Sequence, residues 1–210
     1  MNFYKQVEEL KTRAIEILYR NGNFVHNVNH ICNVYQNAMT LQREASVSLG
    51  VQGLAALRLA IYWHDTGRLD REEKEIEPHE KRSARLLAAA AEVVELDQQV
   101  VNAATRMILV HRNRRATQAI AAEDLGARVL WDADKLDIFN PSRCEDILAA
   151  YEAGIQCGEF CLEESTRFWF SLQADFQAKF HFAWSKMEFS RRFVSFSEWR
   201  SQRLSQEALH

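Results

Sequence analysis

The sequence predicts an all-helical protein organised as a single domain over residues 1–210. Its 210 residues are enough for one domain with a sizeable core. Apolar residues recur at the spacing of a helix face along almost the whole chain. Only 7 Gly and 2 Pro are present, so few turns are marked, and this favours long helices over a many-stranded sheet. Neither an internal repeat nor a linker-like change in composition divides the chain.

Two helices are expected at the start of the chain. The first is marked by apolar residues at helical spacing from Val7 to Leu18, and Gly22 predicts its end. The second is marked by the apolar series from Val28 to Leu41. It is expected to carry His26 and His30, one turn apart on the same face.

A third, strongly apolar helix is predicted over residues 51–63, directly before His64 and Asp65. Residues 66–78 are acidic and polar and predict a loop, and the alanine-rich segment 79–94 predicts a fourth helix. Asp97 is the expected cap of a fifth helix that ends at His111.

A loop is expected over residues 111–118, followed by a helix over residues 123–139. Asn140-Pro141 predicts the end of that helix. Ser142 and Glu145 have the spacing of a capping box, which predicts that a further helix begins at Ser142.

Aromatic residues are concentrated in the last third of the chain, where nine of the 12 Phe and three of the 5 Trp follow residue 140. Two helical stripes are predicted there. One contains Leu172, Phe176, Phe180, Ala183 and Met187, and the other contains Phe182, Phe189, Phe193 and Phe196. Packing of these helices onto the rest of the domain is favoured over a dimer interface or a wall of a substrate pocket, although aromatic residues are also enriched in those places.

Composition excludes several classes of protein. The net charge of -3 gives no basic surface for duplex DNA or RNA. No apolar run is long enough to span a membrane, and the first residues lack the apolar core of a signal peptide. The cysteines Cys32, Cys144, Cys157 and Cys161 show no CxxC spacing. We therefore expect reduced thiols and a cytoplasmic protein.

The dipeptide His64-Asp65 is the most informative feature, together with His30 before it and Asp134 after it. Two imidazoles and two carboxylates form a ligand set for manganese, iron, cobalt, nickel or zinc, while magnesium prefers more oxygen. Adjacent residues within a helix diverge by about 100°, but at the end of a helix both side chains can reach one ion. Asp134 and Asp137 are three residues apart, which places both on one helix face.

Two ordinary explanations compete with a metal site. A His-Asp pair is often a surface hydrogen bond, and His30 could be a core histidine with a hydrogen-bond partner. The apolar helices that flank each candidate favour the metal site, because they hold polar side chains where burial is costly without a ligand or a partner.

The chain resembles the HD-domain superfamily of metal-dependent phosphohydrolases. The resemblance rests on "NVNHICNV", "LAIYWHDTGR", "HEKRSARLL", "TRMILVH" and "DADKLD", in that order, and covers residues 23–139. It implies an HD-type helical bundle as the metal-binding core, with residues 140–210 as C-terminal helices packed on it. It also implies His30, His64, Asp65 and Asp134 as metal ligands, and His26 as a residue that contacts substrate or supports a ligand.

The resemblance extends to a second set of histidines. Some members of the family bind two metals through further histidines, and His79 and His111 stand at matching points. They are expected either to complete a second metal site or to contact substrate phosphate, and both alternatives stay open.

Several charged residues are candidates for catalysis and substrate binding. Glu80 is a candidate partner of a ligand histidine or of the attacking water, or it only complements the helix dipole. Arg68 and Arg112 suit phosphate oxygens. Lys135 could neutralise substrate charge, and Asp137 could orient a ligand imidazole, or either could be a surface residue.

The expected function is hydrolysis of a nucleotide or other small phosphoester by a metal-activated water, with Asp65, Glu80 and Lys135 in catalytic roles. Two alternatives remain: a di-iron oxygenase on the same fold, and a non-catalytic protein that binds a nucleotide or metabolite. The sequence does not distinguish a monomer from a homodimer.

Overall fold

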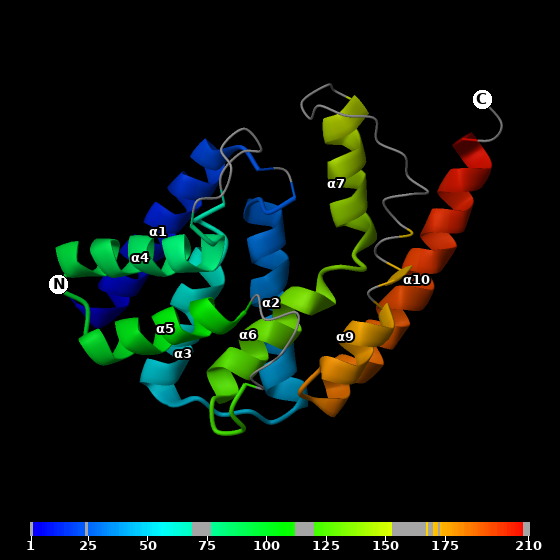
Figure 1. The fold of residues 1–210 in the computed structure, drawn as a ribbon. Coiled ribbons are helices and arrows are strands. Elements are labelled where there is room, and N and C mark those ends of the chain that lie inside the picture. The colour runs from blue at the N-terminus through cyan, green and yellow to red at the C-terminus, as the bar shows by residue number, and fades with distance from the viewer. Residues whose placement is uncertain are drawn as a thin grey trace.

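The computed structural model describes residues 2–23, 25–68, 77–111, 120–152, 167, 170–171 and 173–207. These residues form nine helices and no strand, which confirms the all-helical prediction (Figure 1). The helices are α1 (Phe3–Asn21), α2 (Val28–Glu44), α3 (Gly50–Trp63), α4 (His79–Val93), α5 (Gln98–Val110), α6 (Leu125–Leu136), α7 (Pro141–Glu152), α9 (Gln173–Lys179) and α10 (Ala183–Glu207). None of the described helices combines the length and apolar character needed to cross a membrane.

Side-chain caps fix where several of these helices begin. The side chain of Asn27 accepts a hydrogen bond from the backbone N–H of His30 at the start of α2, at 3.0 Å. Asp97 caps α5 as expected, and Asp124 caps α6. Gly22 ends α1 in the left-handed conformation that glycine adopts without a steric penalty.

The helix α3 lies at the centre of the main core, in contact with α1, α2, α5 and α6. A helix that is apolar on nearly all sides must be buried. Accordingly, every residue of α3 from Ala55 to Trp63 is buried except Arg58. The indole N–H of Trp63 donates to the Leu10 carbonyl at 3.1 Å and ties this helix to α1.

The helix α6 separates the main core from a second cluster formed by the C-terminal aromatic residues. Figure 1 shows α7, α9 and α10 on the far side of α6 from α3, α4 and α5. Phe139, Phe176, Phe180, Phe189 and Phe196 are all buried in this second cluster. The extent of the single domain, and its division near residue 139, remain predictions.

The carboxylate of Asp132 joins these two parts of the fold. It lies on α6, is fully buried, and accepts hydrogen bonds from the backbone N–H groups of His181 and Phe182 at 3.0 and 3.2 Å. The His181 ring Nδ1 donates to it as well, at 2.7 Å. A side chain of α6 therefore satisfies N–H groups just before α10 begins.

The expected capping box at Ser142 and Glu145 is wrong. The helix α7 begins at Pro141, and Asn140 occupies the cap position, where its side-chain oxygen accepts from the Ser142 N–H at 3.2 Å. Proline suits the first helical position because it lacks the N–H that would be unpaired there. Glu145 instead binds Trp199 at 2.7 Å and Arg203 at 2.5 Å, both on α10.

The predicted stripe from Leu172 to Met187 is interrupted. The helix α9 ends at Lys179 and α10 begins at Ala183, so the helical phase does not continue across residues 180–182. Phe176 and Phe180 are buried as expected, whereas Met187 is 68% exposed. Leu172 lies outside the described residues, as do most of the two predicted loops at 66–78 and 111–118.

Gly67 allows α4 to approach the end of α3. We expect Gly67→Ala to destabilise the folded protein more than Gly126→Ala does. A Cβ at Gly67 would overlap the backbone of α4 at the His79 oxygen and the Ser83 nitrogen. At Gly126 it would meet only the end of the flexible Met107 side chain. We expect Gly67→Ala to lower the free energy of unfolding by roughly 1–3 kcal/mol or more, measured by urea denaturation. Equal losses for the two variants would contradict this account.

Candidate metal centre

His64 and Asp65 follow the last residue of α3, as the sequence predicts. His64 still donates its backbone N–H to the Ala60 oxygen at 2.9 Å, and a turn over residues 64–67 then ends the helix. Ser83 of α4 fixes this turn, because its hydroxyl donates to the His64 carbonyl and accepts from the Gly67 N–H, both at 2.8 Å. Both side chains can therefore face the same space.

The four predicted ligands converge in the structure. The Nε2 of His30 is 3.4 Å from an oxygen of Asp134 and 3.6 Å from an oxygen of Asp65. The Nε2 of His64 is 3.4 Å from that same Asp65 oxygen, Oδ2. None of the four residues is more than 8% exposed. The ligand atoms of His30, His64 and Asp134 lie within 4.8 Å of one another.

His79 and His111 lie against the other oxygen of Asp65. The Nε2 atoms of His79 and His111 are 3.3 and 3.8 Å from Asp65 Oδ1, and 3.3 Å from each other. The ligand atoms of His64, Asp65 and His111 also lie within 4.8 Å of one another. The Asp65 carboxylate thus lies between two groups of imidazoles, one on each oxygen.

Hydrogen bonds at Nδ1 orient the imidazoles. His64 and His111 are the C-caps of α3 and α5, and their Nδ1 atoms lie 2.8 and 2.5 Å from the backbone oxygens of Ile61 and Ile108, three residues earlier. Asp137 fills the same role for His30, at 2.7 Å. If each Nδ1 carries the proton, each Nε2 presents a lone pair toward Asp65, as a metal ligand requires.

The residues present fit a divalent metal ion. The Nε2 atoms of His30 and His64 are buried and have no hydrogen-bond partner. Buried polar atoms without partners are costly, and a cation at this point would satisfy both. The mixture of imidazole nitrogens and carboxylate oxygens suits transition metals. The structure therefore contains a buried His/Asp cluster that could hold a metal ion.

The carboxylates of this cluster are ionised. Burial alone would raise the pKa of Asp65, but Arg68, His26 and His64 outweigh it and hold that pKa well below its usual value. Burial likewise opposes ionisation of Asp134, and the pKa is held down by Lys135 and His30. Both carboxylates are therefore anionic at neutral pH.

Two predicted cationic residues lie directly beside the cluster. The Nε of Arg68 is 2.7 Å from Asp65 Oδ1, and the ammonium of Lys135 is 2.5 Å from Asp134 Oδ2. Arg68 is 24% exposed at its side chain, so it lies between the buried carboxylate and solvent. Arg112, the other predicted phosphate contact, lies outside the described residues.

His26 reaches the cluster but not from the expected place. The expectation that it lies on α2 is wrong, because Asn27 caps that helix and His26 precedes it in a bend. Its Nδ1 is nevertheless 2.6 Å from Asp65 Oδ2, and its side chain is 21% exposed. His26 therefore lies at the border between the cluster and solvent.

Glu80 lies in the first turn of α4, with a carboxylate oxygen 3.5 Å from the Nδ1 of His79. Glu80 therefore contacts one ring nitrogen of His79, and Asp65 contacts the other, Nε2. Of the roles expected for Glu80, this contact favours that of a partner for His79, a candidate metal ligand.

Sequence reasoning missed two residues that hold Asp137. Asn140 donates to one Asp137 oxygen at 2.9 Å, and a guanidinium nitrogen of Arg143 lies 3.3 Å from the other. Arg143 also donates to the Val25 carbonyl at 3.0 Å. Asn140 is three residues after Asp137, a spacing that could have indicated it, whereas no local pattern indicates Arg143.

No family model matches the sequence, and no curated protein matches it. Among the solved structures that match, one is similar over 100% of both chains, with a TM-score of 0.67 and 16% sequence identity. It is the crystal structure of a protein from Lactobacillus plantarum that was a structural genomics target. At this identity the similarity extends to the fold alone.

His111→Asn should make the stability of the metal-free protein less dependent on pH. Burial lowers the pKa of His111 from 6.5 to about 4. Between these values the unfolded chain binds a proton that the folded chain does not, so stability falls as the pH falls. One such proton contributes up to about 1.4 kcal/mol per pH unit.

Urea unfolding in the presence of a chelator, at several pH values within this window, measures the slope. Asparagine does not titrate, so the slope should be shallower in the variant. His26 also has a lowered pKa, to about 3, and contributes in the same direction in both proteins. Identical slopes would contradict a buried, neutral His111.

Proposed function

We propose that this protein is a metal-dependent phosphohydrolase of the HD-domain superfamily, acting on a nucleotide or another small phosphoester. The observation that carries the proposal is the convergence of His30, His64, Asp65 and Asp134 with unpaired imidazole nitrogens facing buried carboxylates. This donor set is what a catalytic metal requires, because four protein ligands leave open positions on an ion with about six coordination sites.

The metal ion and the protein would have different roles in the reaction. A bound divalent ion would supply an activated water and polarise a phosphate oxygen. The protein would fix the ligands, since Asp137 and the backbone oxygens of Ile61 and Ile108 hold the imidazoles in one orientation.

Arg68 and Lys135 would bind the charged substrate. The guanidinium of Arg68 uses Nε for Asp65, and its two terminal nitrogens suit two phosphate oxygens. The ammonium of Lys135 has three donors, of which one is directed to Asp134. Both cations would offset negative charge that develops on the transferring phosphoryl group. His26, at the border of the cluster, would contact the same substrate.

The two-sided environment of Asp65 favours a two-metal form of this centre. Its Oδ2 faces His30 and His64, and its Oδ1 faces His79 and His111, so His79 and His111 together with Asp65 would hold a second ion. A centre that holds two ions also suits the second candidate function, a di-iron oxygenase. Iron content and oxygen consumption distinguish the two.

Metal analysis of the purified protein, combined with a screen of nucleotides and generic phosphoesters, tests the proposal. We expect one or two transition-metal ions per chain and release of phosphate or of a nucleotide product with manganese, cobalt, nickel or magnesium. No hydrolysis with any of these metals would refute a phosphohydrolase. Two iron ions per chain with substrate-dependent oxygen uptake would instead support the oxygenase.

Asp65→Ala should abolish metal binding and turnover, because it removes the carboxylate that faces both groups of imidazoles. Asp137→Asn should weaken metal affinity by roughly 10–100-fold, since it acts only through His30. Asp175→Asn, at an exposed position on α9, serves as the control and should leave both properties unchanged. Metal content and turnover are measured together. Nucleotide binding that survives in Asp65→Ala, without turnover in the parent protein, would indicate a non-catalytic binding protein.

A further inference from the structure

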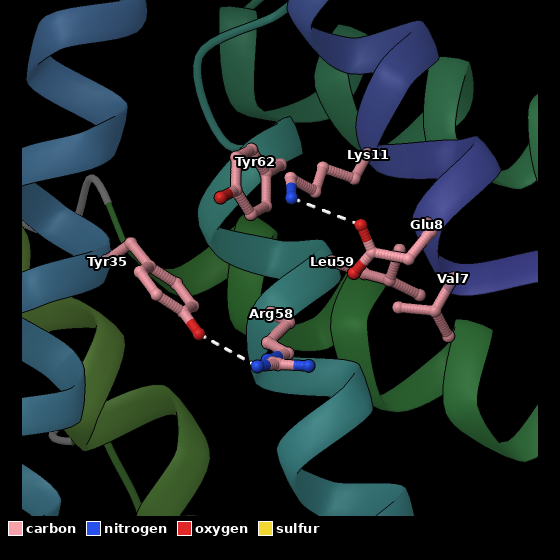
Figure 2. A pocket seen from close by; sticks show the side chains of 7 residues that line it. All are labelled: Val7, Glu8, Lys11, Tyr35, Arg58, Leu59 and Tyr62. Carbon is pink, nitrogen blue, oxygen red and sulfur yellow. Dashed lines mark hydrogen bonds and ion pairs between the residues drawn. The ribbon is translucent and has the colours of Figure 1, made fainter. Parts of the chain in front are cut away.

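A surface hollow lies between α1, α2 and α3, and none of its lining residues belongs to the candidate metal centre (Figure 2). Its volume is about 80 Å³, and it is open to solvent on one side. Val7 and Leu59 provide apolar surface, and the remaining lining residues carry charges or phenol rings. Figure 2 shows the Arg58 guanidinium across the hollow from Lys11 and Tyr62.

Arg58 is the unusual residue of this hollow. It is the one residue between Ala55 and Trp63 that is not buried. A terminal nitrogen of its guanidinium donates to the Tyr35 hydroxyl at 2.8 Å, while its Nε is buried and has no hydrogen-bond partner. No carboxylate of the described chain is paired with it, whereas other arginines such as Arg13 and Arg106 have one. The guanidinium of Arg58 therefore has N–H groups available to donate to an anion.

The other two charges of the hollow cancel each other. The Lys11 ammonium lies 3.1 Å from a carboxylate oxygen of Glu8 and 5.5 Å from the centre of the Tyr62 ring. The hydrogen bond to Glu8 raises the pKa of Lys11 and keeps it charged. The hollow therefore has a single net positive charge, contributed by Arg58, and this charge suits a monoanion better than a phosphate dianion.

Aromatic rings give the hollow a flat apolar wall. The rings of Tyr35 and Tyr62 have their centres 6.0 Å apart and are inclined by 37°. Burial raises the pKa of Tyr62, so its phenol keeps the proton and adds no negative charge. Together with Leu59, these rings offer contact to a planar apolar group.

We propose that this hollow binds a small monocarboxylate with a flat apolar body. The carboxylate would pair with the guanidinium of Arg58, whose planar donors match two oxygens of one anion. The apolar body would lie against the two tyrosine rings and Leu59. The site is independent of the proposed hydrolase function and would stand if that function were disproved.

Benzoate is a suitable probe, followed by two-dimensional NMR of the purified full-length protein. We expect a saturable shift of the Arg58 Nε–H signal and of amides around Tyr35 and Tyr62. Benzyl alcohol, which has the same ring without the charge, and inorganic phosphate should each bind at least tenfold more weakly. Tighter binding of phosphate at Arg58, or benzoate shifts centred on His64 and Asp65, would overturn the proposal.

Substitutions at Arg58 test the pairing directly. Arg58→Met should weaken benzoate binding by roughly tenfold or more, the usual effect of losing hydrogen bonds to a charged group. Arg58→Lys keeps the charge but not the planar pair of donors, so we expect an intermediate loss, and this variant serves if the methionine variant does not fold. Arg43→Met, at a 74% exposed position on α2, is the control and should bind benzoate unchanged. Undiminished affinity in a folded Arg58 variant would refute the site.

Discussion

The Asp65 carboxylate is the group on which the arrangement of the buried His/Asp cluster depends. It is 2% exposed and remains ionised, and a buried anion is stable only with partners on all sides. Its partners come from four separate parts of the chain: the start of α2, the end of α3, the start of α4 and the end of α5. Asp65 therefore determines how closely these helix ends approach one another.

The position of the ligands at helix ends follows from the burial of α3. A helix that is apolar on nearly every side has no face available for a polar group, so its histidine and aspartate can be placed only after its last turn. His111 repeats this arrangement at the end of α5, with the same Nδ1 contact to a carbonyl three residues earlier. In both cases the histidine is the C-cap residue of its helix. Arg58 is the one charged residue within the buried part of α3, and it lines the surface hollow between α1, α2 and α3.

Local patterns in the sequence were sufficient for most helices, whereas the convergence of His30, His64, Asp65 and Asp134 was expected only from the family resemblance. Apolar spacing and caps such as Asp97 act between near neighbours, so they can be read without the tertiary structure. Asn140 was missed as the cap because Pro141 suits the first helical position, and this places the cap two residues before Ser142. The exposure of Met187 was missed because Asp132, from a distant helix, sets where α10 begins.

The contacts of Arg143 with Val25 and of Arg58 with Tyr35 could not have been predicted, because these partners are distant in the sequence. Arg143 joins Asp137 to the Val25 carbonyl, which is 118 residues away from it. Arg58 meets Tyr35 only when α2 and α3 pack side by side. No spacing rule indicates such contacts, and the roles of these residues follow from the folded structure alone.

The contacts of the C-terminal helices suggest why the chain continues beyond the ligand set. Asp132 of α6 holds the start of α10, and Arg143 of α7 holds Asp137, which in turn orients His30. Asp132 lies on α6 two residues before the candidate ligand Asp134, and Asp137 is the C-cap of that helix. The aromatic cluster therefore stabilises α6 from the side opposite to the main core, and through α6 it fixes the Asp134 carboxylate and the Asp137 partner of His30. The C-terminal third thus contributes to the rigidity of the His/Asp cluster.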